Sequence, residues 1–93
     1  MRVKSILGKK VIDAAGDDLG KVDDIEVDWE TGEVESLIIG GDPKIKQRFF
    51  ESKYAKGLLG RVGAKAEHDI VIPKNDVKAI GDVVTLTIDI QES

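Results

Sequence analysis

The chain has 93 residues, no cysteine and 34% charged side chains, with a formal net charge of −4 at pH 7. This length fits one domain, and an aromatic share of 4% requires a core built from Val, Ile and Leu. The lack of cysteine excludes disulfides and thiolate metal sites, and the longest apolar runs have three residues. We therefore expect a cytoplasmic protein without membrane insertion.

The N-terminal half predicts a short strand followed by a β-hairpin. Val11 and Ile12 form the first strand, and glycines and aspartates over residues 16–20 form a turn. Over residues 24–30, apolar and acidic residues alternate, which predicts a strand with one apolar and one acidic face. The apolar positions of this strand are Ile25, Val27 and Trp29.

The hairpin turn is predicted at Thr31 and Gly32, after which the chain returns as a strand over residues 34–39. Gly32 can take a positive φ without steric cost, which suits a type I turn closed by a bulge. Val22 is one residue out of phase with the alternation that follows it. This shift predicts a β-bulge near residues 23–24.

A helix is predicted next, with Asp42 as its N-cap, Pro43 in the first position and Gly57 as its C-terminal stop. Ile45 and Phe49 fall on one side of this helix, and Phe50 and Tyr54 on another, so that a single scaffold face cannot easily bury both pairs. Residues 58–66 are interpreted as a flexible loop because glycines recur in this stretch.

The C-terminal part predicts a strand over residues 69–73 that Pro73 stops, one helical turn within residues 74–80, and a half-buried strand over residues 83–90. Together these elements predict a mainly all-β fold. We expect a small antiparallel β-barrel of five to six strands with one inserted helix, since closure removes open sheet edges.

The order of these motifs resembles the PRC-barrel domain, which occurs in the H subunit of the photosynthetic reaction centre and, in related form, in the ribosome-maturation factor RimM. The resemblance covers residues 4–41 and 68–90 and is closest to stand-alone archaeal PRC-barrel proteins. It rests on residues 5–11 (SILGKKV), 16–20 (GDDLG), Val22, Ile25, Asp28, residues 31–34 (TGEV), 72–73 (IP) and 77–84 (VKAIGDVV).

This resemblance implies a single domain over residues 1–93, with a basic helix–loop insertion at about residues 42–67. It also implies an interaction module that is not an enzyme. Some stand-alone archaeal members resemble adaptors of the FtsZ-based cell-division machinery, which act with SepF or other PRC-barrel proteins as homo- or heterodimers. The alternative is a ribosome-associated or RNA-linked assembly factor resembling the RimM domain, which binds a ribosomal protein of the small subunit.

Several residue groups suggest chemistry that their context does not support. The hairpin acids do not match an EF-hand, because Trp29 stands where its loop needs glycine. The pairs at residues 17–18 and 23–24 are interpreted as charged turns, since no nucleophile or phosphate loop accompanies them. His68 is the single histidine, too few for zinc. We therefore expect no catalytic, cofactor-binding or metal-binding residues.

The charges are strongly segregated along the chain, and this singles out one segment. Residues 44–65 contain seven basic residues and one acidic residue, whereas the segments before and after it carry net charges of −6 and −4. The same basic segment contains three of the four aromatic residues, and interface centres favour aromatics and arginine. The predicted partner-binding residues are Arg48, Phe49, Phe50, Tyr54, Leu58, Leu59 and Arg61.

Two other interpretations of this segment remain open. In one, the helix packs on its own barrel and its lysines face water. In the other, the segment binds single-stranded nucleic acid, although the acidic scaffold would repel a polyanion. Electrostatics also allow the basic helix of one protomer to contact the acidic strand face of a second, which would give a dimer or an array.

Overall fold

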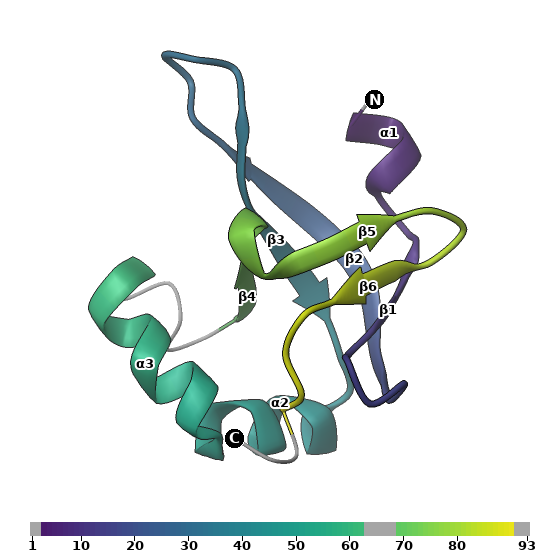
Figure 1. Cartoon of the computed structure of the whole chain (residues 1–93), viewed down its shortest axis with the longest axis vertical. Helices are drawn as coiled ribbons and strands as arrows, with labels where there is room; N and C mark the ends of the chain where they lie inside the picture. Colours follow the sequence, from purple (N-terminus) through teal and green to yellow (C-terminus); the bar gives the residue numbers. More distant parts are fainter. Residues whose placement is uncertain (1–2, 63–68, 91–93) are drawn as a thin grey trace.

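The computed structural model describes the backbone of residues 3–62 and 69–90, and the side chains of residues 4–58 and 69–90 (Figure 1). These residues form six strands and four short helical segments. In chain order they are α1 (Val3–Ile6), β1 (Lys10–Ile12), β2 (Asp18–Val27), β3 (Val34–Gly40), α2 (Pro43–Glu51), α3 (Lys53–Val62), β4 (Ile70–Pro73), the 3₁₀ turn η2 (Lys74–Asp76), β5 (Val77–Ile80) and β6 (Val84–Leu86).

The strands form one sheet in the order β4-β3-β2-β1-β6-β5. Every neighbouring pair is antiparallel except β1 and β6, which run parallel with Val11 opposite Val84. The β-rich fold with six strands is confirmed. Its sheet is mixed rather than purely antiparallel, because β6 pairs in parallel with β1. β4 and β5 are the two ends of the sheet, so the described strands do not close into the predicted barrel.

The predicted hairpin is present as β2 and β3, and its local details agree with the sequence. The register shifts between Val22 and Asp24, where the bulge was predicted. Gly32 has a φ of +75°, as the turn required. The bulge explains how Val22 is buried although it is out of phase with Ile25.

The outer half of this hairpin differs from the prediction. The alternation predicted a continuous apolar face through Trp29, but Val27 is 42% exposed and Trp29 is 92% exposed. The reason is that β4 is too short to cover this part of the hairpin, since it pairs with β3 only over residues 36–39. The tip beyond these residues projects away from the rest of the molecule (Figure 1).

The helical segment begins as predicted and ends differently. The Asp42 carboxylate accepts a hydrogen bond from the Ile45 amide at 2.9 Å, and Pro43 occupies the first turn. The helix then breaks at Ser52 and continues as α3 through Gly57 to Val62. The predicted stop at Gly57 and the predicted loop over residues 58–62 are therefore wrong, while residues 63–66 of that loop lie outside the described part of the chain.

The core joins side chains of the sheet to side chains of α2 and α3, which lie at one end of the molecule (Figure 1). A short helix that the sequence did not reveal, α1, adds Ile6 to this core. The predicted final strand ends at Leu86. The chain then continues without regular structure to Ile90, which is buried. The side chains that are less than 2% exposed include Val11, Leu19, Leu37, Phe49, Leu58, Ile70, Val71, Ile72, Val84 and Leu86.

Candidate functional site

The aromatic residues of the basic segment pack against the body of the protein. Phe49 is fully buried, and Phe50 and Tyr54 are half-buried beside it. The Phe49 ring meets the Phe50 ring edge-on with centroids 5.6 Å apart, and it meets the Tyr54 ring in the same way at 6.1 Å. The Tyr54 hydroxyl donates a hydrogen bond of 2.6 Å to the Asp76 carboxylate, which ties α3 to η2.

The break at Ser52 explains how Tyr54 reaches the same side of the protein as Phe49. A straight helix would direct Phe49 and Tyr54 to different sides, but the chain is extended at Ser52, and the two rings pack edge-on. Among the other predicted partner-binding residues, Leu58 is fully buried and Arg48 is exposed. Leu59 and Arg61 belong to α3, but their side chains lie outside the described residues. A partner-binding role for this set stays a prediction.

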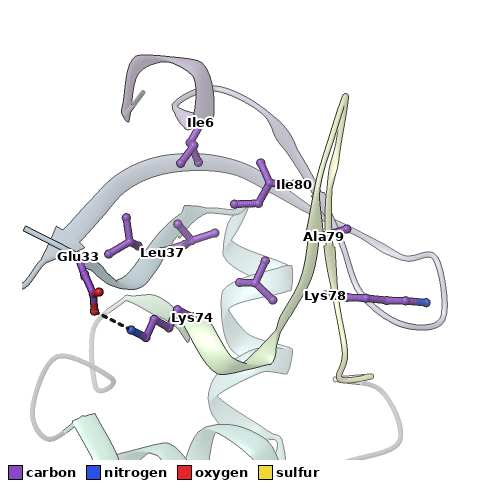
Figure 2. A pocket seen from close by; sticks show the side chains of 9 residues that line it. Ile6, Glu33, Leu37, Lys74, Lys78, Ala79 and Ile80 are labelled. Carbon is purple, nitrogen blue, oxygen red and sulfur yellow. Dashed lines mark ion pairs between the residues drawn. The ribbon is translucent and has the colours of Figure 1, made fainter. Parts of the chain in front are cut away.

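A separate apolar surface lies beside the core, and two of the side chains that line it, Ile6 and Leu37, are only 4% and 1% exposed. A groove of about 560 Å³ lies between β3 on one side and β5 on the other. Figure 2 shows Ile6, Leu37 and Ile80 directed into this groove from three different elements. Val34, Val77 and Ala79 complete its apolar lining.

Charged residues are confined to the edge of the groove. Glu33 and Lys74 form an ion pair of 3.5 Å across its mouth, and Lys78 extends away from the apolar side chains (Figure 2). Because both partners of the pair are more than half exposed, we expect it to stabilise the fold by no more than about 1 kcal/mol. A smaller hollow of about 300 Å³ shares Glu33 and Lys74 and is also lined by Asp28 and Thr31 at the hairpin tip.

The hairpin tip presents Trp29 on a turn that is fixed by hydrogen bonds. The Asp28 carboxylate accepts from the amides of Glu30 at 2.9 Å and Thr31 at 3.3 Å, and the Asp28 carbonyl accepts from the Gly32 amide at 2.7 Å. The turn is therefore ordered without any contribution from the indole. A large apolar side chain that is 92% exposed on such a turn is free to contact a partner.

We call the groove side chains together with Val27 and Trp29 the hairpin face. Its chemistry suits docking better than catalysis, because the ionisable groups that line the groove are Glu33, Lys74 and Lys78, which lie at its edge. No nucleophile or acid–base pair converges there among the described residues. The alternation placed Trp29 on the apolar face of its strand, and nothing in the sequence indicated that Ile6, Val77 and Ile80 would meet.

A comparison with protein families matches residues 1–91 to the PRC-barrel domain. The chain therefore belongs to this family, in agreement with the resemblance seen in its sequence. PRC-barrel domains are generally non-catalytic. No curated protein matches the chain.

Membrane insertion through a helix finds no support in the described part of the chain. None of the helices there combines the length and the apolar character that crossing a bilayer requires.

Proposed function

We propose that this protein is a non-enzymatic adaptor that binds another protein through its hairpin face. The observation that carries the proposal is the exposure of Trp29, which is the most exposed of the large hydrophobic residues in the described chain. Trp is enriched among the residues that dominate binding energy at interfaces, and it contributes most when a partner desolvates it fully. The exposed Trp at the hairpin tip offers such an anchor, and the apolar groove between β3 and β5 offers a second apolar surface.

The hairpin face supports docking more directly than the basic segment does. Phe49 and Leu58 already contribute all their surface to the core, so neither offers contact area to a partner in this conformation. By contrast, Val27 is 42% exposed and Trp29 is 92% exposed, and both would bury further apolar area on binding. The acids around Trp29 favour a partner whose contact surface carries positive charge.

The cellular context that we propose is the FtsZ-based division machinery, with SepF or another PRC-barrel protein as the partner. The support for this context is the sequence resemblance of residues 4–41 and 68–90 to stand-alone archaeal members. The alternative proposal is a ribosome-associated or RNA-linked assembly factor, supported by the resemblance to the RimM domain. Both proposals concern a protein that binds and positions others.

The test compares two single variants in a direct binding assay. Purified SepF and purified small ribosomal subunits from the source organism are offered to the immobilised chain, to Trp29→Ser and to Arg48→Ser. We expect SepF to bind, and Trp29→Ser to weaken binding about thirtyfold, the loss typical of an interface hot spot. Arg48→Ser is the matched control, because this exposed side chain lies on α2, away from the hairpin face.

Both variants should fold normally, since surface substitutions usually change stability by less than about 0.5 kcal/mol. The opposite pattern, with binding lost in Arg48→Ser and kept in Trp29→Ser, would assign recognition to the basic segment. Binding to ribosomal subunits without binding to SepF would favour the alternative context.

A further inference from the structure

The turn between β1 and β2 is organised by one buried aspartate. The Asp13 amide donates to the Asp17 carbonyl at 3.0 Å, and the Asp13 carbonyl accepts from the Gly16 amide at 3.0 Å. One carboxylate oxygen of Asp13, Oδ1, accepts from the amides of Ala15 at 3.0 Å and Asp17 at 2.9 Å. The last two hydrogen bonds satisfy one of the two oxygens of the Asp13 carboxylate.

The second oxygen of this carboxylate is buried without a partner. Asp13 is 1% exposed, and its Oδ2 has no hydrogen-bond partner among the described residues. A buried carboxylate oxygen is costly to leave unpaired, because it has lost water and gained nothing in return. The arrangement therefore calls for a positively charged or donating group at Oδ2.

Two further carboxylates lie at the same place. Ligand oxygens of Asp13, Asp17 and Asp89 are all within 4.8 Å of one another. Asp89 comes from the other end of the chain and is held there because the Ala14 amide donates to the Ile88 carbonyl at 2.8 Å. No ion pair among the described residues neutralises Asp13 or Asp17, although the adjacent Asp18 lies 3.6 Å from the ammonium of Lys10.

We propose that the carboxylates of Asp13, Asp17 and Asp89 bind one Ca²⁺ ion. Carboxylate oxygens are the ligands that hard divalent cations prefer, and an ion at this point would pair the orphaned Oδ2 and offset the repulsion among three acids. No metal site was predicted from the sequence, because Asp89 lies 72 positions after Asp17 and residues 17–18 were interpreted as a charged turn.

The irregular origin of the ligands favours Ca²⁺ over Mg²⁺. Oxygens that all lie within 4.8 Å of one another can share one ion. Ca²⁺ accepts about six to eight oxygen ligands in flexible geometry, whereas Mg²⁺ demands a near-ideal octahedron and gives up its water reluctantly. Backbone carbonyls and water would complete its coordination, as they do at other calcium sites.

The bound ion would fasten the C-terminal segment to the first turn of the sheet. Asp89 follows the last strand, so the segment over residues 87–90 would be held by the ion as well as by the Ala14–Ile88 hydrogen bond. Because the ion binds the folded chain, it should raise the stability of the fold by mass action.

The experiment titrates CaCl₂ into the full chain after treatment with a chelator, and follows the heat of binding and the unfolding temperature. We expect saturable binding of one ion per chain and a rise in Tm of about 10 °C at a hundredfold excess over Kd. MgCl₂ should give a smaller rise, and NaCl at equal ionic strength almost none. An equal response to all three salts would overturn the proposal. The absence of Ca²⁺ binding would also overturn it, and a water molecule would then be the partner of Oδ2.

The variants remove one ligand without removing the turn. Asp17→Asn keeps the backbone groups that close the turn, and we expect it to weaken Ca²⁺ binding about tenfold or more. Its metal-free Tm should not fall, since it removes one of three repelling charges. Asp18→Asn is the matched control and should bind Ca²⁺ like the unmodified chain; equal losses in both variants would overturn the assignment. Asp13→Asn is less informative, because Asp13 also closes the turn.

Discussion

At the scale of single residues, Gly20 shows how closely two strands of the sheet approach. Its φ is +121°, and a Cβ built there would meet the Gly40 carbonyl oxygen, with the Gly40 carbon at 2.9 Å and the Gly41 Cα at 3.0 Å. The sequence marked Gly20 as part of a turn, but the structure places it inside β2. Glycine is required there both by the backbone conformation and by the neighbouring strand.

We predict that Gly20→Ala destabilises the fold by about 3 kcal/mol, since it adds a clash with backbone atoms to the cost of a positive φ. The matched control is Gly32→Ala, where φ is +75° but nothing lies within 4 Å of the added Cβ. This control should cost about 1 kcal/mol, the conformational term alone. Urea unfolding followed by circular dichroism measures both values, and equal losses would contradict the steric argument.

At the scale of elements, Ser52 decides the shape of the helical segment. Its hydroxyl donates to the Phe49 carbonyl at 2.6 Å at the end of α2 and accepts from the Ala55 amide at 3.1 Å at the start of α3. Serine competes with the helix for backbone hydrogen bonds and therefore favours helix ends. The sequence contains this signal, but the predicted stop was Gly57. Gly57 is instead tolerated within α3, where its Cβ position faces open space.

We predict that Ser52→Ala destabilises the fold by about 2 kcal/mol, because it removes the cap of α3 and leaves the amide of the buried Ala55 without its partner. Asp42→Ala is the matched comparison, since Asp42 caps α2 at an exposed position and its loss should cost about 1 kcal/mol. Thermal and urea unfolding report these differences. A larger effect from Asp42→Ala would show that the Ser52 junction contributes little.

At the scale of the whole molecule, opposite charges lie at opposite ends. The hairpin tip with its acids stands at one end of the longest axis, and α2 with its lysines stands at the other (Figure 1). A contact between the hairpin of one copy and the helix of a second would therefore be head-to-tail. Such a contact joins two different surfaces and propagates unless the rotation closes a ring, whereas an isologous contact stops at a dimer.

We predict salt-sensitive self-association beyond the dimer at high micromolar concentration, measured by sedimentation velocity. Trp29→Ser should block the hairpin surface, and the double variant Lys44→Glu/Lys46→Glu should block the helix surface. Each variant alone should be monomeric, and their mixture should stop at a dimer, because one intact hairpin meets one intact helix. A strictly monomeric chain, or a dimer insensitive to salt, would contradict this arrangement.

Local chemistry determined much of this protein from its sequence alone. The hairpin, the bulge after Val22, the turn at Gly32 and the helix start at Asp42 depend on neighbouring residues, and all were predicted. The family was also evident, because its motifs are local patterns in a fixed order.

The tertiary structure decided which surfaces remain open. Trp29 is exposed because β4 is too short to cover the hairpin tip, and the groove forms where α1, β3 and β5 come together. The Asp13 cluster forms because the C-terminal segment returns to the first turn. Each of these features depends on how far one element reaches past another, and sequence periodicity carries no information about that distance.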